Sequence, residues 1–176
     1  MIFHRPAALD QESRAMVKAI SFVGPSGSGK TELICRLSAW LQDRGLRVAV
    51  LKHTHKETLG DEGKDTGRYR RTGVRLVALA APRALQITRA LPEEAPLQEV
   101  LVLMAPETDL ILVEGYKSGP LPKVVLTGPG QDSERLNYPQ IIALVSPDAA
   151  PGGVPVFRPD QIAELGKFLQ QFLGLA

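Results

Sequence analysis

The residues with the clearest chemistry are Gly24–Thr31, which read GPSGSGKT. This run matches the pattern G-x-x-x-x-G-K-[ST], whose glycines let backbone N–H groups point toward a phosphate. We expect Lys30 to bind the β- and γ-phosphates of a nucleotide and the hydroxyl of Thr31 to bind Mg²⁺. The expected phosphate contacts come from the whole loop: Gly24, Pro25, Ser26, Gly27, Ser28, Gly29, Lys30 and Thr31.

A carboxylate is expected to complete this site from the end of a second apolar strand. Asp109 and Glu114 flank the apolar run 110–113, and about 16 Å separates such residues along a strand. Because parallel strands bring their carboxyl ends to the ligand edge of a sheet, Glu114 is the expected Mg²⁺ ligand, directly or through water. Gly115 would let the backbone approach a phosphate closely. Asp109 is expected to begin the strand or to cap the preceding helix.

Basic and imidazole side chains follow another apolar strand, 48–51. Lys52, His53 and His55 come just past its end, where we expect them to meet phosphates or a partner protein. A solvated loop is one alternative. A metal site made of His53, His55 and Cys35 is another, although no third ligand has suitable spacing.

A polar segment, 63–73, resembles a switch segment of nucleotide-binding proteins. Asp65 is expected to cap a short helix. Arg68 and Arg71 are three residues apart, so they would lie on one side of that helix and could meet an anion together. An exposed helix held by salt bridges is the alternative.

Strands and helices alternate along most of the chain. This order predicts one α/β domain over 18–176 with a largely parallel sheet and a small β extension, in three layers. Residues 1–17 are expected to form a disordered tail, and Met16 is a second possible start. Helices are expected at 30–44, 65–72, about 97–104 and 159–172. Strands are expected at 19–23, 48–51, 76–80, 84–88, 109–114, 123–126, 141–145 and 154–157.

Composition excludes several classes of protein. The chain has 176 residues, a formal net charge of +2 and 44% hydrophobic residues, so collagen, coiled coil and wholesale disorder are excluded. The charge is too mild to favour nucleic-acid binding, and no apolar run approaches the length of a membrane span. The one cysteine, Cys35, expected as a small core residue, fits a protein of the reducing cytoplasm.

Four segments together resemble one known family, the molybdopterin-guanine dinucleotide biosynthesis adapter proteins (MobB). They are GPSGSGKT at 24–31, LKHTH at 51–55, GKDTGRYRRTG at 63–73 and DLILVEGYK at 109–117. The resemblance covers about residues 18–173. The phosphate loop alone would indicate only the superfamily, and the other three segments make the match specific.

The resemblance implies a P-loop fold, GTP and Mg²⁺ as ligands, weak GTPase activity and a homodimer. It implies a supporting role in the last step of molybdenum cofactor synthesis, beside a guanylyltransferase and other enzymes of that synthesis. It also places Lys52 to His55 and Asp65 to Arg71 beside the nucleotide or the partner. The chain departs from the family where Lys56 follows His55 and where Tyr69 replaces a common histidine, which puts a histidine-dependent role of that loop in doubt.

Two other functions remain open from the sequence. A small-molecule kinase would share the phosphate loop, and segment 63–75 could imitate its lid, but no acceptor pocket can be argued from sequence. A binding module without turnover is the third possibility. No catalytic base or arginine finger can be assigned, and slow hydrolysis is therefore expected.

Overall fold

A computed structural model describes residues 17–56, 59–130, 137–148 and 153–175. The chain divides into two compact units. The first contains residues up to His53 and from Leu97 onward, and the second contains Thr54–Pro96. The expected tail, 1–17, lies outside the described residues except for Val17.

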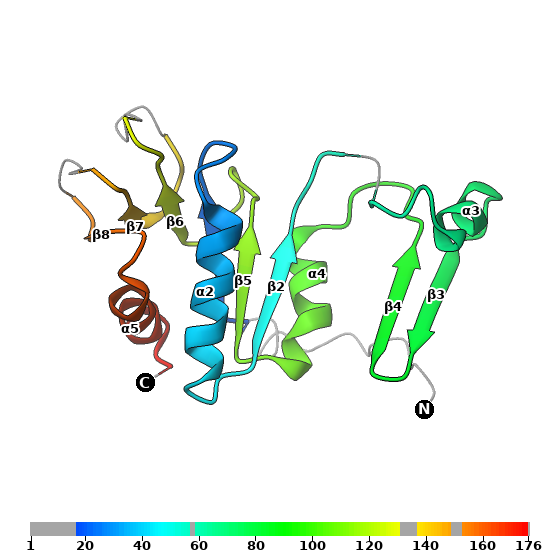
Figure 1. Cartoon of the computed structure of the whole chain (residues 1–176), viewed down its shortest axis with the longest axis horizontal. Coiled ribbons are helices and arrows are strands. Elements are labelled where there is room, and N and C mark those ends of the chain that lie inside the picture. The colour runs from blue at the N-terminus through cyan, green and yellow to red at the C-terminus, as the bar shows by residue number, and fades with distance from the viewer. Residues whose placement is uncertain (1–16, 57–58, 131–136, 149–152, 176) are drawn as a thin grey trace. The chain divides into compact units, whose positions relative to one another are not determined.

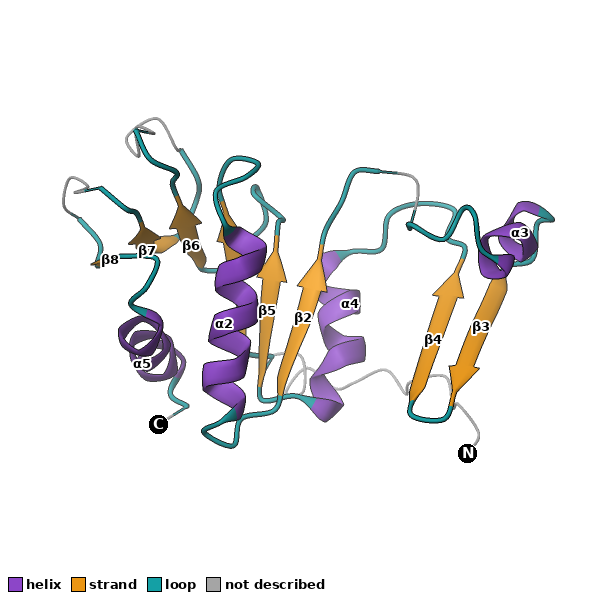
Figure 2. Cartoon of the chain, in the orientation of Figure 1, coloured by secondary structure: helices purple, strands orange, loops and turns teal. Residues whose placement is uncertain are grey.

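The first unit is an α/β sandwich around one parallel sheet (Figures 1 and 2). Its sheet has six strands in the order β2-β5-β1-β6-β7-β8, and all neighbouring strands are parallel. The strands are β1 (Ala19–Val23), β2 (Val48–Lys52), β5 (Leu110–Glu114), β6 (Lys123–Leu126), β7 (Ile141–Val145) and β8 (Val156–Phe157). The helices are α2 (Lys30–Gln42), α4 (Leu97–Met104), the 3₁₀ turn η1 (Ala105–Glu107) and α5 (Ile162–Leu173).

Helices cover both faces of this sheet because β1 and β5 are apolar on both sides. Phe22 and Leu112 face the core shared with Leu37 of α2 and Leu165 of α5. Ile111, on the other face, packs in a second cluster that includes α4 residues. Strands buried on both faces have continuous apolar sequences, which explains why β1 and β5 could be located from the sequence.

Helix α2 crosses from the end of β1 to the start of β2, and β5 lies between these two strands. The carboxyl ends of β1, β2 and β5 therefore meet at one edge, where the loop before α2 also lies (Figure 1). This edge carries the candidate site.

The second unit is small and contains a helix and a hairpin. Helix α3 (Asp65–Arg71) precedes the antiparallel strands β3 (Leu76–Ala81) and β4 (Ala84–Arg89). Buried Val77 belongs to β3, and α3 packs on that strand. This hairpin is the expected small β extension.

The α/β class and the largely parallel sheet are confirmed, with differences at element ends. Helix α5 begins at Ile162 instead of Pro159, because Arg158–Gln161 form a turn in which Gln161 N–H donates to the Arg158 carbonyl (3.0 Å). Cys35 is exposed, contrary to the expected core position, since the buried face of α2 carries Leu33, Ile34, Leu37 and Leu41 instead.

Trp40 on α2 joins the first core from a half-buried position. A Cβ added at Gly166 of α5 would lie 2.4 Å from its ring, and the guanidinium of Arg44 lies 3.6 Å from the ring centroid. The missing side chain at Gly166 therefore lets α5 lie against the indole.

The close approach predicts that Gly166→Ala destabilises the protein. An ordinary helical Gly→Ala change stabilises by about 0.5–1 kcal/mol, whereas overpacking against the indole should cost about 1–3 kcal/mol. Urea unfolding followed by fluorescence of Trp40, the single tryptophan, measures this directly. Gly63→Ala is the control, because an added Cβ there has no atom within 4 Å. A stabilised Gly166→Ala protein would contradict the packing argument.

Candidate functional site

The phosphate loop connects β1 to α2 as the motif requires. Gly24 has φ +149°, and a Cβ there would lie 2.2 Å from the Leu126 carbonyl oxygen at the end of β6. Gly29 has φ +85° at the N-cap of α2, and the Leu33 N–H donates to its carbonyl (2.9 Å). Only glycine satisfies both positions without strain. The loop is thereby wound tightly before the N-terminus of a 13-residue helix, which favours an anion.

The ammonium of Lys30 lies against the loop itself. It donates to the carbonyls of Pro25 (2.5 Å) and Gly24 (3.3 Å) and to the Ser28 hydroxyl (3.4 Å). Burial lowers the pKa of Lys30, nearby Glu114 opposes that effect, and Lys117 and Lys52 add to it. Several cations therefore converge on the same small region, as expected for a site that binds a polyanion.

The carboxylate of Glu114, at the end of β5, contacts side chains of two other elements: Thr31 in the first turn of α2 and Lys52 at the end of β2. The Thr31 hydroxyl donates to Glu114 Oε2 (3.0 Å), and Lys52 Nζ lies 3.2 Å from Glu114 Oε1. One cavity contains these three residues; its described lining is Ser26, Gly27, Gly29, Lys30, Thr31, Glu32, Lys52 and Glu114. The structure thus brings together the expected loop, Lys52 and the expected acid.

The pairing of Thr31 with Glu114 fits the chemistry of magnesium. Mg²⁺ prefers oxygen ligands, and in nucleotide sites it is held by one or two protein groups together with phosphates and waters. A hydroxyl and a carboxylate 3.0 Å apart, beside the phosphate loop, supply such a pair. Among the described residues, no group of three or more His, Cys, Asp or Glu side chains is placed to hold a metal, so the alternative His–Cys site receives no support.

His53 and Gly115 fix the backbone beside Glu114. His53 N–H donates to the Glu114 carbonyl (2.9 Å), which extends the β2–β5 pairing by one residue. Gly115 has φ +113°, and a Cβ there would lie 2.9 Å from His53 Cβ. The rings of His53 and Tyr116 stack with centroids 4.2 Å apart. Gly115 is thus close to His53, and its expected approach to a phosphate stays a prediction.

A buried lysine, Lys123, supports the connection that follows Glu114. Its side chain is fully buried and donates to the carbonyls of Gly119 (2.6 Å) and Leu121 (2.8 Å). Burial lowers the pKa of this lysine. In the sequence, Lys123 is only the first residue of an expected strand, and nothing local indicates that its side chain is buried. Tyr116 and Lys117 come after Glu114 and Gly115 and end the segment DLILVEGYK, but no local pattern indicates a role for either side chain.

Asp109 comes directly before β5, close to the expected strand start, and does not cap the preceding helical turn, whose C-cap is Thr108. It accepts hydrogen bonds from the backbone N–H of Arg47 (2.8 Å) and from its guanidinium (2.6 Å). The Arg47 hydrogen bonds lower the pKa of Asp109. Asp109 thus joins the amino-terminal ends of β2 and β5, whereas Glu114 lies at the carboxyl ends of these strands.

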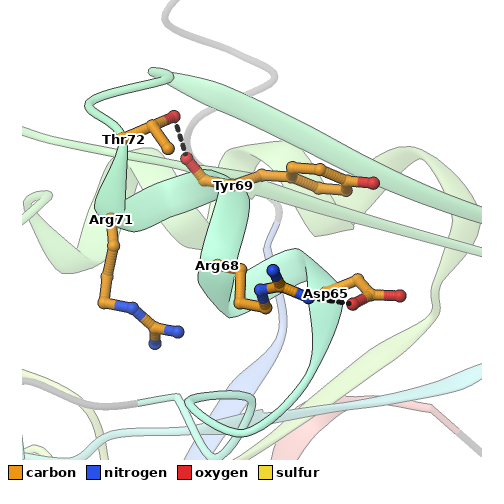
Figure 3. Close-up of a pocket in the computed structure, with 5 residues that line it drawn as sticks. All are labelled: Asp65, Arg68, Tyr69, Arg71 and Thr72. Carbon is orange, nitrogen blue, oxygen red and sulfur yellow. Dashed lines mark hydrogen bonds and ion pairs between the residues drawn. The ribbon is translucent and has the colours of Figure 1, made fainter.

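The remaining expected residues, His55, Asp65, Arg68 and Arg71, belong to the second unit. Arg68 and Arg71 line one pocket together with Asp65, Tyr69 and Thr72 (Figure 3). Arg68 pairs with Asp65 (3.6 Å), while Arg71 donates to the Glu62 carbonyl (2.7 Å). Asp65 is the first residue of α3 and not its cap, which is Lys64 without a side-chain bond. The two arginines share a pocket, and their binding of an anion stays a prediction.

Asp61 stabilises the second unit, a role that the sequence did not indicate. It is buried and forms an ion pair with Arg70 of α3. A Cβ at Gly67 would lie 2.2 Å from the Asp61 carbonyl oxygen. The glycine therefore allows α3 to pack closely against the loop that precedes it. A single acid in a polar segment gives no periodic signal, which is why the sequence did not single it out.

Comparisons with known proteins decide the family. The family model described as molybdopterin guanine dinucleotide synthesis protein B matches residues 19–147. The chain belongs to the MobB family. The match covers the phosphate loop, Lys52 and Glu114 together, which confirms the resemblance seen in the four sequence segments.

Curated relatives of this MobB chain span most of its length. A "probable molybdopterin-guanine dinucleotide biosynthesis adapter protein" of Bacillus subtilis (strain 168) is 34% identical over 88% of this chain and 93% of its own. The corresponding adapter protein of Escherichia coli (strain K12) is 32% identical over 77% of this chain and 81% of its own.

The crystal structure of Bacillus subtilis MobB resembles the fold, with a TM-score of 0.73 and 29% sequence identity over 88% of this chain and 97% of that one. The P-loop NTPase fold is therefore confirmed. None of the helices in the described part of this MobB chain has the length and apolarity that a membrane crossing requires.

The ion pair of the second unit predicts a pH-dependent stability. The hydrogen bond from Arg70 lowers the pKa of Asp61 below 3.8. Its stabilisation is therefore present above the unfolded pKa and is lost as pH falls through the lower folded pKa. Asp61→Asn should lower the free energy of unfolding at neutral pH, and the difference from the unsubstituted protein should shrink below pH 3.8. Urea unfolding followed by far-UV circular dichroism measures the free energy of unfolding of both proteins at neutral and at acidic pH.

Asp65→Asn is the matched control for Asp61→Asn. The Asp65–Arg68 pair is exposed on both side chains, and exposed pairs contribute little. Equal destabilisation by the two variants at neutral pH would contradict the special role of Asp61.

Proposed function

We propose that this protein is a GTP-binding accessory protein with weak GTPase activity in the biosynthesis of the molybdenum cofactor, molybdopterin guanine dinucleotide. It acts in the cytoplasm and assists a partner guanylyltransferase. The observation that carries the nucleotide part is the hydrogen bond from Thr31 to Glu114 behind the phosphate loop. The biosynthetic part is supported by the names of relatives that match nearly full length.

In this proposal, the phosphate loop, Thr31 and Glu114 bind the phosphates of the nucleotide and its metal ion. The backbone of 24–29 and the ammonium of Lys30 hold the phosphates, while Thr31 and Glu114 hold Mg²⁺, which neutralises charge on the phosphates when bound. Slow turnover is supported by the lining of the cavity, whose described residues include no arginine or histidine. Positioned water and an arginine are what accelerate hydrolysis in related chemistry.

The test is calorimetric titration of the purified protein with GTP and with ATP, each with Mg²⁺. We expect clear preference for GTP, and Lys30→Ala should lose triphosphate binding with an unchanged circular dichroism spectrum. A preference for ATP would favour a small-molecule kinase and contradict the proposal. Unchanged GTP affinity in Lys30→Ala would exclude the phosphate loop as the binding site.

We also propose a homodimer that forms through the β3–β4 hairpin. Leu76, Leu85 and Ile87 are exposed, and the strand pairing puts them on one face together with Ala78 and Ala80. A two-stranded hairpin is marginal alone, and an apolar exposed face favours association. Strands β6 and β7 of the first unit, by contrast, are paired on both sides and offer no free edge.

Ile87→Glu is expected to convert the dimer to a monomer, since a charge would be buried in the apolar contact. Sedimentation equilibrium of the full chain measures the mass directly. Gln86→Glu, at a neighbouring exposed position on the other face of the hairpin, should leave the dimer intact. A dimer that persists in Ile87→Glu would place the interface elsewhere.

A further inference from the structure

Lys52 has a position that the phosphate loop alone does not explain. Both oxygens of Glu114 are engaged, one by the Thr31 hydroxyl and the other by the Lys52 ammonium. The Glu114 side chain is 14% exposed, whereas that of Lys52 is 61% exposed. The carboxylate is therefore held inside the site, and the lysine is the partner with freedom to move.

The backbone beneath Lys52 is fixed. Lys52 is in register with Glu114 across β2 and β5, and the next residue, His53, donates its N–H to the Glu114 carbonyl. The His53 ring also stacks on the Tyr116 ring, which further fixes the backbone next to Lys52. Any response of Lys52 to a ligand must therefore be a swing of its four-carbon side chain.

Electrostatics sets the direction of that swing. Lys52 and Lys30 both lie near Glu114, and their mutual repulsion contributes to the lowered pKa of Lys30. A divalent cation bound between Thr31 and Glu114 would repel the Lys52 ammonium and compete for the same carboxylate. A terminal phosphate in the same cavity would attract that ammonium, because Lys52 lines the cavity.

We propose that Lys52 is a sensor of the γ-phosphate. While no nucleotide is bound, the Glu114 carboxylate holds the Lys52 ammonium. With Mg²⁺ held by Thr31 and Glu114, the Lys52 ammonium would leave the carboxylate and would pair with the terminal phosphate. Lys52 therefore discriminates triphosphate from diphosphate. This inference rests on the proposed nucleotide binding. Because Lys52 stands two residues before the second unit, which begins at Thr54, the swing occurs where the chain leaves the nucleotide site.

The first experiment compares two ligands by calorimetry with Mg²⁺: GDP and a GTP analogue with a β–γ imido bridge. Lys52→Ala and Lys52→Met should each reduce the preference for the triphosphate about 10- to 100-fold, the range of a charge-assisted hydrogen bond. Affinity for GDP should not fall, because a diphosphate lacks the γ-phosphate and the variants leave Glu114 free of its competing cation. Lys167→Ala, which removes the same charge from an exposed site on α5, should change neither affinity.

A second experiment measures the competition without any nucleotide. Titration with Mn²⁺, followed by electron paramagnetic resonance of the free ion, should show tighter binding in Lys52→Ala than in the unsubstituted protein. Adding Glu114→Gln should abolish that gain, because the gain comes from a carboxylate freed of its cation.

The outcomes separate this inference from the proposed function. An unchanged ratio of triphosphate to diphosphate affinity in both Lys52 variants would overturn the sensor. Equal loss of both ligands would make Lys52 a general phosphate contact and overturn it too. If the unsubstituted protein bound neither nucleotide, the proposed function would fail and the sensor with it, whereas GTP binding that depends on Lys30 but not on Lys52 removes the sensor alone.

Discussion

The hydrogen bond between Thr31 and Glu114 is the interaction on which the candidate site depends. Its two residues are 83 positions apart in sequence, and they meet because β5 lies beside β1 in a parallel sheet. The phosphate loop alone presents N–H groups and one lysine. With Glu114 added, the same edge presents oxygen ligands to a hard cation next to donors for phosphate, which is the combination that a magnesium nucleotide needs.

Close backbone approach keeps this edge in place. Gly24 lies against the end of β6, and Gly115 lies against His53, each at a distance that leaves no room for a Cβ. Behind them, the fully buried Lys123 holds the connection from β5 to β6 by two carbonyls. Burying an ammonium is costly unless its donors are used. The backbone of the site is thus preorganised, whereas the Lys52 side chain that pairs with Glu114 is largely exposed.

The second unit has a different construction. Its helix α3 is only seven residues long, too short to be stable alone, and it depends on Asp61, Gly67 and β3 for packing. The hairpin leaves an apolar face exposed in the single chain. A unit with so little core of its own is consistent with the proposed dimer, in which a second chain would cover this apolar face.

The sequence by itself determined most of the elements, and it picked out the phosphate loop, Lys52 and Glu114, which the structure brings together. Continuous apolar runs located β1 and β5, and the spacing of GPSGSGKT located the phosphate loop, since these signals are local. The choice of Glu114 over Asp109 also followed from strand direction. Tertiary structure decided what depends on distant pairs: Asp109 binds Arg47, and Lys52 binds Glu114. Partners far apart in sequence leave no periodic trace, and only the packed chain selects them.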